Sequence, residues 1–331
     1  GLALEAGALG KNLTEWQYGI ASTHPRWNVS GTYMQVLPRF VSVDENGNEY
    51  EFLNEYFDDI GTCLSKIFKK GYEWPFDCKK VLTGSSIIDL LVFRENVMKG
   101  RRVYLDFRKN PYGLAELPYD KLENEAREYL ENAHACFGTP LERLQFMNMP
   151  AYDLYLSKGV DLEKEMLEIA LCAQHNNGGL DIDMWWQTNV PHLFACGEVA
   201  GSHGVYRPGG SALNAGQVGS TRCAQYISKH QNNELADANS FDTVCEAAVI
   251  KHLDITRSIL SDCDNIASLT DKYQKLMDKV AGPIRDASSF DCASGEFIGA
   301  FNDFSKLAKV DSQNRLWLAY RLRDALLAEW M

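Results

Sequence analysis

The residues best suited to chemistry lie together in one segment of the chain, HLFACGEVAGSHGVYRPGGSALN at 192–214. Its apolar run at 193–196 predicts a buried strand, and the glycine after it allows a turn that places the carboxylate of Glu198 at the strand end. Arg207 follows, and a glycine pair leads into a small-residue helix that begins at Ser211. This order suits an anionic, nucleotide-type ligand, because glycine lets the backbone approach closely and a helix start offers N–H groups and partial positive charge.

The elements that must position this segment are predicted from hydrophobic periodicity. Strands are expected at 33–37, 39–43 and 102–107, and helices at 86–99, 121–135 and 162–172. After a polar linker at 230–239, helices are expected throughout 241–331, with breaks at 282–283 and near 292–295, and with Asp311 as the N-cap of the last helix. Strands and helices followed by a helical region predict an α+β protein.

Composition excludes several classes of protein. The net charge of −12 argues against a nucleic-acid surface, and no apolar run approaches the length of a membrane span. The nine cysteines form no C-x-x-C pair and no zinc-ligand spacing with histidine, so no metal site is predicted. An odd number of cysteines, several in apolar surroundings, predicts reduced thiols and a cytoplasmic location.

Two stretches, HNNGGLDID and TNVPHLFACGEVAGSHGVYRPGGSAL, resemble the flavoprotein family of succinate dehydrogenases and fumarate reductases. That family carries a His-x-x-Gly-Gly strand, then VPGL(F/Y)AAGE, then HGxxRxGGxxL. The stretches GLALEAGALGKNLTEWQYG, ENVMKGRRVYLDF and IRDASSF agree with other parts of the family pattern. The GxGxxG segment that holds the ADP half of FAD in this family does not occur in the sequence.

The resemblance therefore predicts a fragment of a longer flavoprotein. The chain begins without Met and ends within an amphipathic pattern, and both features agree with that expectation. It implies a capping α+β domain with the entering helix of the FAD domain at 1–190. The C-terminal part of the FAD-binding domain, with its last strand and helix, is expected at 191–231, and a truncated helical domain at 238–331.

The resemblance also implies a cofactor site. The residues expected to contact FAD are Gly197, Glu198, Gly209, Gly210, Ser211, Ala212 and Leu213. Glu198 would accept hydrogen bonds from flavin ribityl or ribose hydroxyls, and the helix start would face the pyrimidine edge of the ring. Two other interpretations stay open: Glu198 as a solvated loop acid, and the small residues as close helix packing.

Arg207 and His175 are the expected catalytic residues. In the family, the matching arginine holds the substrate dicarboxylate, as a guanidinium can in bidentate fashion. His175 matches the family's substrate-binding histidine. The alternatives are a salt bridge between Arg207 and a loop acid, and a structural hydrogen-bonding role for His175.

Two family residues are absent from the expected positions. Ser86 occupies the position of the proton-donating arginine, and Gly19 that of a histidine in a QFHPT stretch. Neither residue can perform the missing role. The candidates to replace them in space are Arg39, Arg94, His24 and Tyr206.

The sequence thus predicts an FAD-dependent oxidoreductase that transfers hydride through flavin N5 to or from a small anionic, carboxylate-like substrate. That substrate need not be fumarate, since adenylylsulfate reductase flavoproteins handle other anions. An electron donor or acceptor is implied but not identified, and the chain alone is expected to bind FAD poorly. Two alternatives stay open: a catalytically silent capping or assembly module, and a non-flavin protein with a chance motif.

Overall fold

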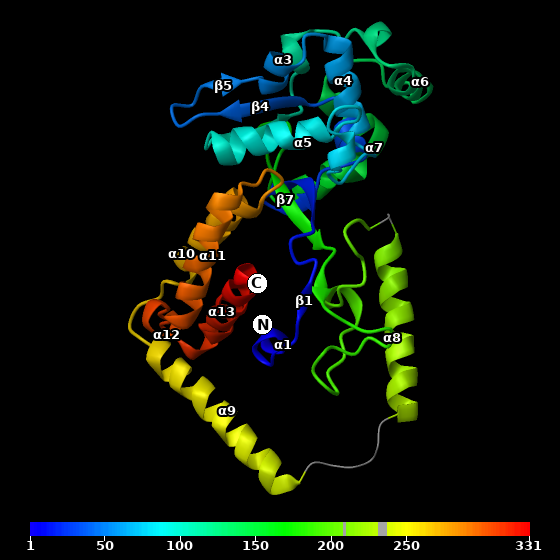
Figure 1. Ribbon diagram of the computed structural model, residues 1–331. Helices are drawn as coiled ribbons and strands as arrows, with labels where there is room; N and C mark the ends of the chain where they lie inside the picture. The colour runs from blue at the N-terminus through cyan, green and yellow to red at the C-terminus, as the bar shows by residue number, and fades with distance from the viewer. Residues whose placement is uncertain (208–209, 231–236) are drawn as a thin grey trace. The chain divides into compact units, whose positions relative to one another are not determined.

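The computed structural model describes residues 1–207, 210–230 and 237–331. The chain folds as two compact units: one is Gln17–His175, and the other combines Gly1–Trp16 with Asn176–Met331 (Figure 1). Each unit combines helices with strands, which confirms the predicted α+β class. Among the described residues, no helix has both the length and the apolarity that crossing a membrane requires.

A six-stranded sheet organises the unit Gln17–His175. Its order is β3-β2-β7-β6-β4-β5. The strands are β2 (Trp16–Thr23), β3 (Arg26–Asn28), β4 (Arg39–Val43), β5 (Glu49–Tyr50), β6 (Arg102–Asp106) and β7 (Leu167–Asn176). β6 pairs antiparallel with both β4 and β7, placing Leu105 opposite Phe40 and Leu167. These apolar side chains are buried, so the register is set by the hydrophobic pattern.

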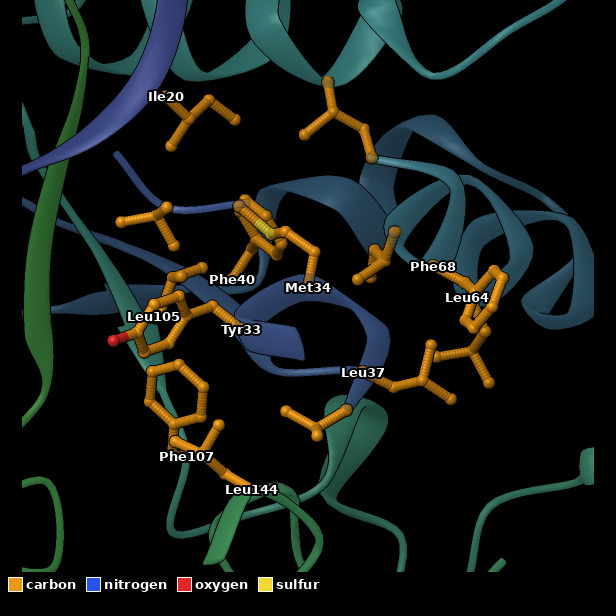
Figure 2. Close-up of a cluster of buried hydrophobic side chains, with 14 of the residues drawn as sticks. Ile20, Tyr33, Met34, Leu37, Phe40, Leu64, Phe68, Leu105, Phe107 and Leu144 are labelled. Atoms are coloured by element: carbon orange, nitrogen blue, oxygen red, sulfur yellow. The ribbon is translucent and has the colours of Figure 1, made fainter. Parts of the chain in front are cut away.

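Helices pack their apolar faces with this sheet in a common core. They are α2 (Thr32–Gln35), α3 (Phe52–Tyr56), α4 (Ile60–Lys69), α5 (Ser86–Phe93) with the π-helical turn η2 (Arg94–Met98), α6 (Asn124–Asn132) and α7 (Pro140–Ser157). Short 3₁₀ turns lie at η1 (Cys78–Lys80), η3 (Pro111–Gly113) and η4 (Tyr119–Lys121). Figure 2 shows Ile20, Met34, Phe40, Phe68 and Leu105 in this buried cluster.

The predicted strands at 39–43 and 102–107 are confirmed as β4 and β6, and the helix at 86–99 as α5 with η2. Two predictions in this unit were wrong. Residues 33–37, expected as a strand, lie mainly in the single helical turn α2, because a short apolar run fits either state. Residues 167–172, expected as helix, belong to β7, where Leu167 and Ile169 alternate inward with period two.

The other unit contains short strands near its start and long helices after them. The elements are α1 (Leu2–Glu5), β1 (Gly10–Lys11), β8 (Gly179–Leu180), η5 (Gly197–Val199), α8 (Ser211–His230), α9 (Ala238–Ile259), α10 (Ile266–Ala281), α11 (Ala287–Asn302), α12 (Phe304–Leu307), η6 (Gln313–Arg315) and α13 (Leu316–Trp330). Helices α10, α11 and α13 share an apolar cluster that includes Tyr273, Phe297 and Leu326.

The helical prediction for 241–331 is confirmed, and so is the break at 282–283, where α10 ends. The break predicted near 292–295 is wrong: α11 continues through Gly295, because Ala293 and Phe297 on either side are buried and hold the helix. Asp311 is not the N-cap of the last helix. The turn η6 intervenes, and Arg315 occupies that position instead.

Candidate functional site

Closely packed backbone forms the base of the candidate site, within the unit that contains Asn176–Met331. β8 pairs antiparallel with β1 and forms a parallel bridge from Leu180 to Ala200. The amide of Gly201 donates to the carbonyl of Leu180 at 3.0 Å. A Cβ on Gly179 would lie 2.4 Å from the carbonyl oxygen of Val199, so this approach requires glycine.

The prediction of a buried strand at 193–196 is wrong, because these residues do not form a strand of a sheet. Within the described residues its backbone forms a single antiparallel bridge, from Phe194 to Gln187. Thr188 and Ala195 add hydrogen bonds on either side of this bridge, which makes a tight hairpin rather than a sheet strand. Ala195 is nevertheless buried, as its apolar neighbourhood suggested. A strand needs a continuous partner for its backbone groups, and a short apolar run alone does not supply one.

The turn predicted after this segment is present. Gly197 has a φ of +78°, in the left-handed region that favours glycine, and it begins the 3₁₀ turn η5. Glu198 lies in this turn with its side chain exposed. A Cβ on Gly197 would meet no atom within 4 Å, so the backbone there borders open space.

Helix α8 begins at Ser211, as predicted. Gly210 before it has a φ of +77°, whereas Gly209 lies outside the described residues. Ala212 is half-buried, and the side chain of Leu213 is 84% exposed. A Cβ on Gly216 would lie 3.6 Å from the Cα of Gly197, so α8 packs against the glycine turn. The structure therefore brings the Gly197–Glu198 turn and α8 together.

The two expected catalytic residues lie in different units. Arg207 is half-buried at the end of the segment that precedes α8. His175 is buried near the end of β7. Next to it on the same strand, Gln174 donates from Nε2 to the carbonyl of Gly19 at 3.1 Å.

The positions of the two missing family residues have packing roles. Ser86 is fully buried, and its Oγ accepts a hydrogen bond from the amide of Asp77 at 3.0 Å. A Cβ on Gly19 would lie 2.4 Å from the indole ring of Trp74. Neither position presents a group that can donate a proton to a substrate.

Sequence reasoning missed three residues around the site. The Asn177 side chain donates to the carbonyl of Val205, two residues before Arg207. The ring of Trp186 covers Gly219 on α8. Cys223 on α8 meets Cys196, and burial together with that contact raises the pKa of the Cys223 thiol to about 11. Of these three residues, only Asn177 has a local sequence signal, since it is a polar residue directly before a glycine pair. The contacts of Trp186 and Cys223 join segments that are distant in sequence.

This arrangement fits the ring edge of a nucleotide-type redox cofactor. Gly197 borders open space, Glu198 is an exposed acceptor, and α8 packs against the same turn. Apolar side chains stand exposed nearby, with Val199 at 55% and Leu213 at 84%, as expected where a flat apolar group would cover them. These residues make this part of the chain the candidate site for a nucleotide-type cofactor.

Comparison with known proteins gives the family. The model of the FAD binding domain family matches residues 1–213, and the chain belongs to that family. FAD is accordingly its cofactor.

Similar proteins include one component of the fumarate reductase (CoM/CoB) of Methanothermobacter marburgensis, 42% identical over 91 residues that make up 27% of this chain and 16% of that protein. An L-aspartate oxidase of Clostridium acetobutylicum is 33% identical over 101 residues, 27% of this chain and 23% of that protein.

Among solved structures, Sdh1 of Mycobacterium smegmatis superposes with a TM-score of 0.63 and 18% identity, over 99% of this chain and 48% of that one. At this identity the likeness describes the fold. The chain thus spans about half the length of this structure and a smaller share of the relatives matched by sequence.

Proposed function

We propose that this chain forms part of an FAD-dependent oxidoreductase that acts on a small dicarboxylate or a similar anion. The family match carries this proposal, supported by the glycine turn packed against α8. The names of two relatives refer to fumarate and L-aspartate, which are both four-carbon dicarboxylates. The nine free cysteines agree with a reducing, cytoplasmic location.

The residues that would hold the cofactor are Gly197, Glu198, Gly209, Gly210, Ser211, Ala212 and Leu213. Bound FAD supplies a hydride acceptor and donor at its N5 atom. Glu198 would accept hydrogen bonds from hydroxyl groups of the cofactor chain. The N-terminus of α8 would stabilise negative charge beside it, because a helix carries partial positive charge there.

Arg207 and His175 would bind the substrate. A guanidinium matches a carboxylate with two parallel hydrogen bonds and stays charged at any physiological pH. His175 would donate a further hydrogen bond to the anion. Both roles anchor the substrate in its ground state and do not by themselves deliver a proton.

Proton delivery would differ from the family pattern, because Ser86 and Gly19 stand where the resemblance expects the arginine and the histidine. Arg39 is not a substitute: its guanidinium is engaged by Glu49, Glu51 and Asp106. The side chain of Tyr206 is 67% exposed and adjacent in sequence to Arg207, so we take Tyr206 as one candidate for this role. This difference in proton delivery favours a substrate other than fumarate.

The packing roles of Ser86 and Gly19 favour one second candidate function, a capping or assembly module without turnover. With Ser86 and Gly19 used for packing, the chain would keep anion binding and lose the proton transfer that completes the reaction. This candidate predicts flavin retention and anion binding without any oxidoreduction of dicarboxylates.

Two variants test the site in a flavin-loaded polypeptide extended to the length of the relatives, because the 331 residues alone are expected to bind FAD poorly. Glu198→Ala should lower the flavin retained per chain several-fold, measured by absorbance after gel filtration, because an acceptor for cofactor hydroxyls is lost. Arg207→Ala should retain flavin and weaken dicarboxylate binding about 10- to 100-fold, because a charged hydrogen-bonding partner is lost.

Glu246→Ala and Arg257→Ala are matched controls, since both residues are exposed on α9. Neither should change flavin content or dicarboxylate binding. If Glu198→Ala and Arg207→Ala behave like these controls, the site assignment is wrong.

A further inference from the structure

Asn177 connects the glycine-containing strand end to the segment that carries Arg207. Its Nδ2 donates to the carbonyl oxygen of Val205 at 3.2 Å, and its own amide donates to the carbonyl of Glu15 at 2.9 Å. Asn177 is 5% exposed, whereas Val205 is 65% exposed. A buried, fixed residue thus holds an exposed loop two positions before Arg207.

The hydrogen-bond pattern of the Asn177 side chain indicates that it holds the backbone at Val205 rather than only filling space. Within the described part of the chain, its Oδ1 is buried and accepts no hydrogen bond. Burying an unsatisfied carbonyl costs free energy, which an apolar residue of the same size would avoid. Of the two polar atoms of the side chain, Nδ2 is the one that makes a hydrogen bond, to the Val205 carbonyl.

The neighbouring Asn176 provides a contrast. Its Nδ2 donates to the carbonyl of Leu13 at 2.9 Å, and its Oδ1 accepts from the amide of Gly178 at 2.7 Å. The Asn176 side chain therefore stabilises the base of the site, with both of its polar atoms bonded away from the 202–207 segment. The two adjacent asparagines therefore contact different segments and can be tested separately.

From these contacts we infer that Asn177 is a positioning residue for Arg207. By holding the Val205 carbonyl, it fixes the backbone from which the Arg207 guanidinium extends toward an anionic substrate. A bidentate grip on a carboxylate depends on such orientation, because small displacements of a binding group sharply reduce its effect. This inference rests on the substrate-binding role proposed for Arg207.

The test compares Asn177→Ala, Asn177→Leu and the control Asn176→Ala in the flavin-loaded polypeptide extended to the length of the relatives. Asn177→Leu keeps the branched shape of the side chain and removes the donor without burying a charge, so it remains informative if the alanine variant folds poorly. Malonate is a dicarboxylate whose single methylene group cannot be oxidised to an alkene. Its binding is measured by titration, from the change that it causes in the flavin absorbance. Loop order is measured independently as the rate of chymotrypsin cleavage after Tyr206.

Both Asn177 variants should bind malonate about three- to tenfold more weakly, the range expected for one hydrogen bond. Both should also be cleaved faster after Tyr206. Asn176→Ala should change neither value, whatever it does to thermal stability. In an Arg207→Ala background, Asn177→Ala should add no further loss of malonate affinity, because it acts through Arg207.

Several outcomes would overturn the inference. They are wild-type cleavage and affinity in both Asn177 variants, equal loosening in the Asn176 control, faster cleavage with unchanged malonate affinity, or a further loss in the double variant. Failure of the proposed function is distinguishable, since Arg207→Ala would then bind malonate like the wild type.

Discussion

Lys70 and Asp89 form an ion pair that is wholly enclosed in the unit Gln17–His175. Their charged atoms are 2.5 Å apart and both side chains are 0% exposed. Burial raises the pKa of Asp89 to about 6, although the Lys70 ammonium acts in the opposite direction. Lys70 also donates to the carbonyl of Glu73 at 3.1 Å, so the pair joins the end of α4 to α5.

Removing one partner of this pair should cost more than removing both. Asp89→Leu or Lys70→Met is expected to lower the free energy of unfolding by about 3–5 kcal/mol, because one buried charge is left without its partner. The double variant Lys70→Met/Asp89→Leu should recover much of that loss. Urea unfolding of all four proteins measures this, and additive single effects would contradict the expectation.

At the scale of elements, α8 depends on two glycines that meet different neighbours. A Cβ on Gly219 would lie 2.4 Å from the Trp186 indole, whereas one on Gly216 would be at an ordinary 3.6 Å from Gly197. Trp186 has a φ of +67°, unusual for a bulky residue. Its ring is held between α8 and the hairpin, with the Arg222 guanidinium 5.7 Å from the ring centre.

These two glycines should therefore respond oppositely to the same substitution. Gly219→Ala is expected to destabilise the chain by about 1–3 kcal/mol, because the added methyl overpacks against the indole. Gly216→Ala should be neutral or stabilising by up to about 1 kcal/mol, since alanine favours the helix and meets no obstacle. Thermal unfolding monitored by circular dichroism compares them, and equal losses would refute this account of α8 packing.

The whole molecule raises the question of cofactor affinity. The described site offers one glycine turn, one helix start and an exposed acid, and the 331 residues contain no GxGxxG segment for a pyrophosphate. The chain also spans only 48% of the structure of Sdh1. We therefore expect the described residues to supply only part of the polar contacts that a dinucleotide needs.

We expect the 331-residue chain purified alone to retain well below one FAD per chain. A polypeptide extended to the length of its relatives should retain FAD in near-stoichiometric amount. The visible absorbance of the flavin ring, read after gel filtration, measures the cofactor in both preparations. A yellow, stoichiometric preparation of the short chain would show that the described residues suffice for binding.

The sequence by itself determined the features that depend on neighbouring residues. The turn at Gly197, the start of α8 at Ser211 and the strand β4 follow from glycine conformation and local periodicity. The family was also identifiable, because the glycines and charged residues of its motif are contiguous in the chain.

Tertiary structure alone decided what depends on partners distant in sequence. Whether 167–172 became strand rested on pairing with β6, and 193–196 failed as a strand because, within the described residues, its backbone found only one bridge. The Asn177–Val205 hydrogen bond, the Trp186 ring over Gly219 and the Lys70–Asp89 pair likewise join separate segments. Local preferences differ by about 1 kcal/mol per residue or less, so such packing and pairing can override them.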